Sequence, residues 1–201
     1  MQNKLEELYR ANDDIIDLMK LIKSIGWKSI REQSIQRMFY LTKVLYAFVN
    51  ENSTNPYEDY HFSVSISGPY SDLLNRSILD LKVREAVEES QEGDIKLIDQ
   101  NYKFSKNENK IEWQKIIVYI IGLYGESKIF SFTINDPLYK EAIETNSQKE
   151  LNTSPENITV KVLNDFKSAF EETLENVSEI SKQEYLELYF EYVFSKIITK
   201  K

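Results

Sequence analysis

The chain has 201 residues and a formal net charge of −8, with 41% hydrophobic and 29% charged residues. This length supports one large or two small domains with a proper core. The absence of cysteine excludes disulfides and thiolate metal sites and is typical of a reducing compartment. Residues 1–11 lack the apolar core of a signal peptide, and the most apolar run, 116–123, is far shorter than the roughly 20 residues that span a bilayer. We therefore expect a soluble, cytoplasmic protein.

The negative charge is spread evenly along the chain. Residues 1–105 contain 13 basic and 17 acidic side chains, and residues 106–201 contain 12 and 16, so each half carries −4. Binding to nucleic acid through its phosphates needs a concentrated basic face. Neither half has one, although clusters of lysine and arginine that form only in the folded chain remain open.

Helical spacing of apolar residues begins within the charged arm of residues 1–11 and becomes regular after it. Asn12 or Asp13 can cap a helix with a broad apolar face, and Gly26 lies where a left-handed residue would end that helix. The sequence therefore predicts a first main helix over residues 12–25.

A second helix is predicted by a capping-box pattern, in which Ser29 is followed three residues later by Glu32. Apolar residues then keep helical spacing through Val49. Residues 50–59 are rich in turn formers, so we expect a loop there.

The central stretch begins with an alternation of apolar and polar side chains over residues 60–67, which predicts a half-buried strand. We expect Gly68 and Pro69 to end that strand, because proline lacks an N–H and glycine accepts positive φ. Ser71 then stands at an N-cap position, with Asp72 in the first turn of a helix that we expect to run on to Gly93.

A second alternation follows this helix, with Ile95 and Leu97 on one side of residues 99–101 and Tyr102 and Phe104 on the other. This pattern predicts a β-hairpin. Two helices, a strand, a capped helix and a hairpin, in this order, predict a winged-helix-like module over residues 1–105.

The second half of the chain has mainly helical signals. Residues 108–124 are apolar on nearly all sides, which indicates a buried helix, although their Ile, Val and Tyr content leaves a strand over 116–123 as an alternative. Asp136-Pro137 predicts the start of a short helix to about Thr145, and Ser154-Pro155-Glu156 that of a longer one to about Ile180. The predicted fold is thus mainly α with a small β portion (α+β), in which a helical part, residues 106–201, packs on the N-terminal module.

The last predicted helix, residues 182–199, is apolar around roughly three quarters of its circumference by its helical wheel, leaving a narrow acidic strip. It is either a central core helix or a helix with one face on the core and a tyrosine-rich face toward another protein. Under the second interpretation the partner-binding candidates are Tyr185, Tyr189 and Tyr192, together with Tyr70 after the Gly-Pro turn.

Signals of catalysis are weak throughout the chain. His61 is the one histidine, no serine lies in a GxSxG motif, and the five glycines are scattered rather than gathered into a phosphate-binding loop. Paired carboxylates lie in charged stretches that are typical of solvated helix faces. We expect no catalytic residue, no metal and no cofactor, and therefore a protein that is not an enzyme.

In a winged helix, the helix after the turn normally enters the major groove of DNA. Here that segment, residues 71–89, has more acidic than basic side chains: Arg76, Lys82 and Arg84 against Asp72, Asp80, Glu85, Glu88 and Glu89. Such a helix would repel phosphates, so the sequence favours a module that binds protein.

Three segments carry a resemblance to a known family: SIQRMFYLTKVLYAF (34–48), YHFSVSISGPYSDLLNRSILDL (60–81) and IKLIDQNYKF (95–104). The leucine- and tyrosine-faced helix, the aromatic strand, the GPYS turn and the Tyr-x-Phe hairpin end resemble the middle component of bacterial ABC-three-component systems, which include Lamassu-type anti-phage defence. The resemblance covers roughly residues 12–125. Through the helix, strand and Gly-Pro turn alone, the chain is more distantly similar to Panacea/SocA-like antitoxin domains.

The resemblance implies a non-catalytic scaffold subunit that bridges an SMC/Rad50-like ATPase and an effector subunit, often a nuclease. In such a complex the ATPase would handle DNA and the effector would carry the reaction. Two alternatives remain from the sequence: an antitoxin that masks a toxin, and a winged-helix regulator that binds DNA by itself.

Overall fold

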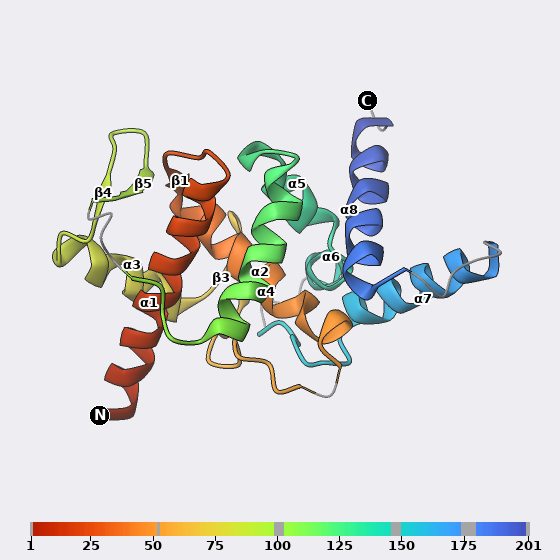
Figure 1. The fold of residues 1–201 in the computed structure, drawn as a ribbon, viewed down its shortest axis with the longest axis horizontal. Helices are drawn as coiled ribbons and strands as arrows, with labels where there is room; N and C mark the ends of the chain where they lie inside the picture. Colours follow the sequence, from red (N-terminus) through yellow and green to blue (C-terminus); the bar gives the residue numbers. More distant parts are fainter. Residues whose placement is uncertain (1, 52, 99–102, 146–149, 174–179, 200–201) are drawn as a thin grey trace.

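Helix α2 (Glu32–Val49) lies at the centre of the molecule in the computed structural model (Figure 1). Its side chains are buried at nearly every position from Ser34 to Phe48. It contacts helices α4 (Glu108–Gly122), α5 (Glu126–Asn135), α7 (Ile158–Thr173) and α8 (Lys182–Thr199). A helix that is apolar on nearly all sides is stable only when other elements surround it, and α2 has this environment.

The structure describes residues 2–51, 53–98, 103–145, 150–173 and 180–199. Within them the fold is mainly helical with small antiparallel sheets, which confirms the α+β class. The remaining elements are α1 (Gln2–Ser24), β1 (Ile30–Arg31), β2 (Ser63–Ser65), β3 (Gly68–Tyr70), α3 (Asp72–Val83), β4 (Val87–Glu89), β5 (Asp94–Leu97) and α6 (Pro137–Glu144).

Helix α1 is one continuous helix from Gln2, so the predicted start at Asn12 or Asp13 is wrong. Asn12 is buried within the helix and bonds to α3: its Nδ2 donates to Asp80 Oδ2 at 2.7 Å, and its Oδ1 accepts from the Ser77 hydroxyl. Asparagine is common at helix starts because it competes for backbone hydrogen bonds. Here a neighbouring helix satisfies its side chain instead.

The predicted end of α1 at Gly26 is confirmed. Gly26 has φ +91°, its N–H donates to the Lys23 carbonyl, and the N–H of Trp27 donates to the Ile22 carbonyl, both at 3.0 Å. These two hydrogen bonds form a Schellman motif, which a glycine at this position permits. The motif places Trp27 beside the last turn of α1.

A three-stranded antiparallel sheet has the order β1-β5-β4. Ile30 of β1 pairs with Ile95 of β5, so α2 begins only at Glu32 and the predicted capping box at Ser29 is wrong. Residues 30 and 31 are paired in the sheet and therefore cannot form the first turn of the helix.

The hairpin of this sheet also differs from the prediction. Helix α3 ends at Val83, not at Gly93, and Glu85 (φ +55°) leads into β4. Strands β4 and β5 pair around Ser90–Gly93, where the Ser90 N–H donates to the Asp94 carbonyl at 2.8 Å. The predicted turn at 99–101 and Tyr102 lie outside the described residues, and Phe104 is not in a strand.

Gly68 and Pro69 do not end a strand, as predicted, but lie within one. The chain reverses at Ile66-Ser67, and Gly68-Pro69-Tyr70 forms the return strand β3, which pairs with β2 in the register Ser63↔Tyr70 and Ser65↔Gly68. Proline is tolerated here because this sheet has only two strands, so one edge of β3 needs no ladder hydrogen bond. Helix α3 starts at Asp72, so the predicted N-cap position of Ser71 is confirmed, but its buried hydroxyl makes no capping hydrogen bond.

The C-terminal helices match the predictions more closely. Residues 108–122 are helical, which removes the strand alternative for α4, and Asp136 Oδ2 accepts from the Tyr139 N–H at the start of α6. Helix α5 was not predicted, and α7 begins at Ile158 instead of Ser154. Residues 174–179, which would carry α7 toward its predicted end, lie outside the described residues.

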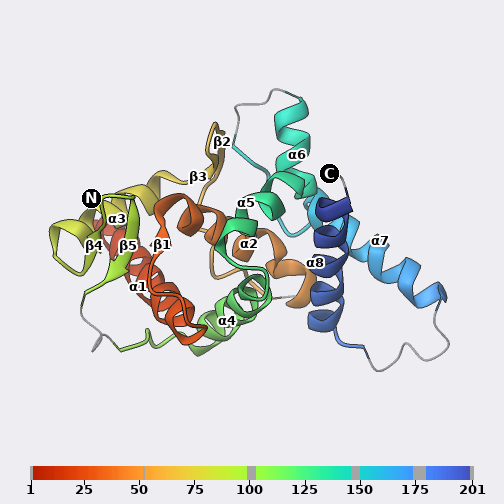
Figure 2. The same ribbon diagram turned by 90° about the horizontal axis from the view of Figure 1, so that it is seen from above.

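Elements on both sides of position 105 contribute to one buried core. Trp113 of α4 donates its indole N–H to the Thr42 carbonyl of α2 at 2.8 Å, and Lys110 pairs with Asp14 of α1 at 2.6 Å. Figure 2 shows α4 beside α1 on one side of α2, with α7 and α8 on the other. No single helix in the described ranges is long and apolar enough to cross a membrane, and α4 with α5 reaches that length only across a bend of 102°.

Candidate protein-interaction surface

The β2–β3 hairpin, which carries Tyr70, projects from the part of the molecule formed by α2, α5 and α6 (Figure 2). A side chain at Gly68 would meet Arg37 of α2, because an added Cβ would lie 3.1 Å from Arg37 Nε. Arg37 therefore packs directly against the backbone of the hairpin that carries Tyr70.

Gln36 of α2 holds the end of the hairpin through both groups of its side-chain amide. Gln36 Nε2 donates to the Ser71 carbonyl at 3.2 Å, and the Ser71 N–H donates to Gln36 Oε1 at 2.9 Å. Both residues are buried. These two hydrogen bonds give the Ser71 backbone the partners that a neighbouring strand would otherwise supply. They fix the junction between β3 and α3.

Tyr40 and Asp136 fix the base of the same region. Asp136 is buried and accepts from the Tyr40 hydroxyl at 2.5 Å and the Thr159 hydroxyl at 2.9 Å, and burial raises the pKa of its carboxyl group. Burial also raises the pKa of Tyr40 well above its ordinary value. Tyr139, in the first turn of α6, donates its hydroxyl to the Ser65 carbonyl at 3.0 Å. The hairpin thus stands on a buried, hydrogen-bonded support.

Arg37 is the charged residue of this face. Its Nη2 donates to the Ser67 carbonyl at 2.6 Å, and its guanidinium lies 4.7 Å from the centre of the Phe130 ring. Its Nε is buried without a hydrogen bond, and burial lowers the pKa of Arg37. Among the residues that the structure describes, no carboxylate lies within ion-pair distance of it. Arg37 therefore keeps bonding capacity that its own chain does not use.

Three exposed apolar side chains lie on the elements around Arg37. Ile66 at the hairpin turn is fully exposed, Tyr70 is 37% exposed and Phe130 of α5 is 41% exposed. We call Arg37, Ile66, Tyr70 and Phe130 the hairpin surface. Aromatic residues and arginine are the types enriched in protein interfaces and in their energetic centres.

The three tyrosines of α8 do not form one exposed face. Tyr185 and Tyr189 are buried, with their rings against Phe170 and Phe166 of α7 at centroid distances of 6.2 and 5.6 Å. Tyr192 is 48% exposed. Because α7 covers Tyr185 and Tyr189, neither tyrosine is accessible to a partner. Of the three predicted partner-binding tyrosines of α8, only Tyr192 is exposed. Helix α5 lies between β3 and α8 and contacts both, so Tyr70 and Tyr192 are on separate surfaces (Figure 1).

Sequence reasoning missed a second exposed apolar region, on α4. Tyr119 and Leu123 are 51% and 79% exposed, so the prediction that this helix is buried on most sides is wrong at its last turn. They line a pocket of about 480 Å³ between α4 and α8, with Glu187 on its opposite wall. The helical spacing of Ile116, Tyr119 and Leu123 was readable from the sequence, but which face the core would cover was not.

The structure strengthens the argument against DNA binding by α3. Arg76 pairs with Asp72 at 2.8 Å, Arg84 pairs with Asp80 at 2.6 Å, and Lys82 pairs with Glu89 at 2.8 Å. All three basic side chains of this segment thus lie beside carboxylates, so the segment has no net positive charge for phosphates even though these ion pairs are partly exposed.

His61 is exposed and pairs with Glu150. Within the described ranges, no group of three or more His, Cys, Asp or Glu side chains is arranged to hold a metal ion.

Comparison of the chain with protein-family models, curated proteins and solved structures gave no match.

Proposed function

We propose that this chain is a non-catalytic subunit that binds other proteins through the hairpin surface. The observation that carries the proposal is Arg37, whose guanidinium stacks on Phe130, binds the hairpin that carries exposed Ile66 and Tyr70, and has no carboxylate partner among the described residues. A partner segment with a carboxylate next to apolar side chains would complete this surface. Desolvated arginine and aromatic residues contribute strongly to such contacts.

We further propose the complex that the family resemblance implies. In it, this chain bridges an SMC/Rad50-like ATPase and an effector nuclease of a bacterial anti-phage defence system, in the cytoplasm, and contacts DNA only through the ATPase. The strand order β1-β5-β4, with α1, α2 and α3 preceding β4, supports a winged-helix-like N-terminal module. The ion-paired basic residues of α3 support a role for that module in binding protein rather than DNA.

The test is co-expression of the full chain with an SMC/Rad50-like ATPase and an effector from its coding neighbourhood, followed by affinity capture; a neighbourhood without such an ATPase would itself contradict the proposed complex. Ile66→Ser removes the fully exposed apolar side chain of the hairpin surface, and Val83→Ser makes a matched change at an exposed position of α3. We expect Ile66→Ser to weaken capture of one partner at least about tenfold, the value of one lost apolar contact at an interface centre. Val83→Ser should have no effect.

Two results would contradict the proposal. Equal capture by Ile66→Ser, Arg37→Gln and the unsubstituted chain would remove the hairpin surface as the contact. Capture of a small toxin in place of the ATPase would assign the chain to the antitoxin class.

A further inference from the structure

A pocket at the C-terminal end of α1 has a chemical character opposite to that of the whole chain. It encloses about 400 Å³ and is lined by Met19, Lys20, Ile22, Lys23, Gly26, Trp27, Lys28, Lys96 and Leu97. Four lysines and no carboxylate thus line one pocket in a protein of net charge −8. Its volume lies within the usual range for small-molecule sites.

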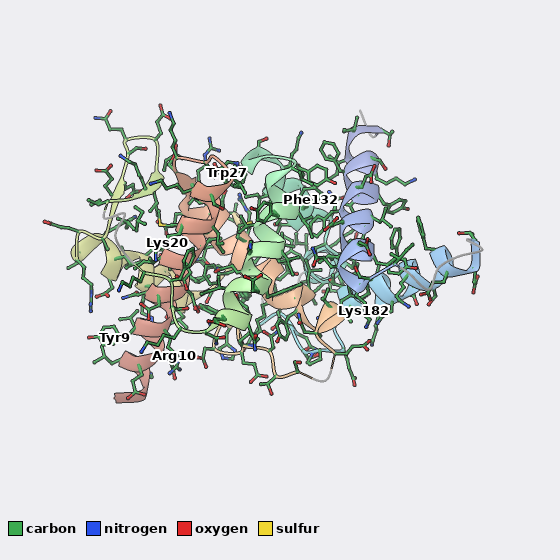
Figure 3. The ribbon with its side chains drawn as sticks, viewed as in Figure 1. Tyr9, Arg10, Lys20, Trp27, Phe132 and Lys182 are labelled. Carbon is green, nitrogen blue, oxygen red and sulfur yellow. The ribbon has the colours of Figure 1, made fainter. Side chains whose placement is uncertain are left out.

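The fold builds this pocket from segments that are distant in the sequence. Lys20 and Lys23 lie three residues apart and so project from one side of α1, and the Schellman motif at Gly26 turns Trp27 and Lys28 back beside them. Strand β5 brings Lys96 and Leu97 to the opposite wall. Figure 3 shows Lys20 on α1 and Trp27 in the loop that follows it.

Lys28 is the lysine of this pocket that keeps the clearest capacity for an anion, because it is exposed and has no ion-pair or hydrogen-bond partner among the described residues. The Nζ of Lys20 is buried, lies 4.6 Å from the centre of the Phe104 ring and pairs with Asp17 at 3.9 Å, so it adds positive charge to the lining rather than a free donor. Lys96 pairs with Glu88 at 3.0 Å, but both side chains are more than half exposed, so this ion pair is weak and exchangeable.

The apolar residues of the lining suit a flat, uncharged group. Trp27 is partly buried and lies with Met19, Ile22 and Leu97 along the lining. Tryptophan offers a large aromatic face on which a nucleobase stacks, and such stacking is largely independent of the base. Lysine ammonium groups are common ligands of phosphate.

We propose that this pocket, the Trp27 pocket, binds a nucleotide unit, with the phosphate against the exposed ammonium groups of Lys28 and Lys96 and the base against Trp27. A free mononucleotide and a nucleotide of a nucleic acid strand offer the same chemistry, but binding of a DNA strand here would contradict the proposal that the chain contacts DNA only through the ATPase. This site is independent of the hairpin surface, so its failure would leave the proposed partner binding untouched.

The test uses the ¹⁵N-labelled full chain and follows the indole N–H signals of Trp27 and Trp113 by NMR. Adenosine 5′-monophosphate, a short 5′-phosphorylated oligothymidylate and inorganic phosphate are titrated separately. We expect the Trp27 signal to shift with at least one of the two nucleotide probes, whereas Trp113, which is buried, stays in place. A shift of the Trp27 signal with adenosine 5′-monophosphate shows that a free nucleotide is enough for binding. A shift with the oligothymidylate alone shows that the ligand is a nucleic acid strand.

Three variants make the test specific. Lys28→Glu should weaken nucleotide binding at least about tenfold, the value of one charge-assisted contact, and Lys161→Glu, an exposed charge reversal on α7, should leave it within about twofold. Trp27→Leu keeps an apolar contact with the end of α1 but removes the stacking face, so it should also weaken nucleotide binding. Because this variant lacks the Trp27 indole signal, its nucleotide affinity is measured by calorimetry. Absence of any shift at about 1 mM ligand, equal loss in Lys161→Glu, or unchanged affinity of Trp27→Leu would each overturn the proposal.

Discussion

Gln36 binds the backbone of Ser71 through both ends of its side-chain amide, with distances of 3.2 and 2.9 Å. This relationship joins the central helix to the junction of hairpin and α3, where the chain changes direction. The hairpin surface depends on it, since Arg37, the next residue of α2, bonds to Ser67 of the same hairpin.

Replacement of Gln36 by alanine should lower the free energy of unfolding by about 1–3 kcal/mol, because the buried Ser71 N–H loses its partner; the Ser71 carbonyl still accepts from the Asn75 N–H at 3.1 Å. Urea unfolding followed by circular dichroism measures this change. Gln33→Ala, at an exposed position of the same helix, should stay within about 0.5 kcal/mol. Equal stability of the two variants would show that the amide contact contributes nothing.

Gly68→Ala should destabilise the chain by at least about 1 kcal/mol for two reasons: Gly68 has φ +118°, and its added Cβ would lie 3.1 Å from Arg37 Nε. The control is Ser67→Ala, at the neighbouring exposed position, which should have little effect on the unfolding midpoint. A stabilising effect of Gly68→Ala would mean that the hairpin relaxes freely and does not hold Arg37.

The carboxyl group of Asp136 should make stability depend on pH. Because burial raises its pKa, the folded chain retains a proton that the unfolded chain releases above a pKa of about 4. The free energy of unfolding therefore falls as pH rises from that value through the folded pKa. Asp136→Asn should remove this part of the slope in urea unfolding between acid and neutral pH. Asp165→Asn, at an exposed site of α7, should leave the slope unchanged, and an unchanged slope in Asp136→Asn would contradict the assignment.

Gly122→Ala should destabilise the chain, although alanine normally favours a helix over glycine. The added Cβ would lie 2.6 Å from Ile25 Cδ1, so the contact between α4 and the end of α1 is too close for a methyl group. We expect a loss of about 1 kcal/mol or less, because the clashing atom is the end of the partly buried Ile25 side chain, which can shift. Ile25→Val removes the clashing Cδ1, so in that background Gly122→Ala should be neutral or stabilising. If Gly122→Ala lowers the free energy of unfolding equally in the unsubstituted chain and in the Ile25→Val background, the contact with Ile25 Cδ1 is not the cause.

Tyrosines of α8 should divide into two classes. Tyr185→Ala removes a fully buried ring and should cost about 3–5 kcal/mol, whereas Tyr192→Ala should cost less than about 1 kcal/mol because its ring is half exposed. Thermal unfolding separates the two. Partner capture is informative only for Tyr192→Ala, since the Tyr185 variant would lose binding through loss of fold.

Local signals in the sequence identified those features that depend on neighbouring residues alone. Gly26 ends α1 and Asp136-Pro137 begins α6 as predicted, because a left-handed residue and a capped proline start need only their own turn of backbone. The apolar periodicity of residues 108–122 and 182–199 likewise identified α4 and α8 as helices.

Only the tertiary structure decided the features that depend on distant partners. Ser29 looked like a cap until Ile30 paired with Ile95, and Asn12 looked like a helix start until Asp80 and Ser77 satisfied its side chain. The burial of Tyr185 follows from its packing against α7, which no periodicity within α8 indicates. Composition and charge excluded an obvious basic face for either half of the chain. The lysines of the Trp27 pocket come from α1, the loop after it and β5, and folding alone brings these segments together.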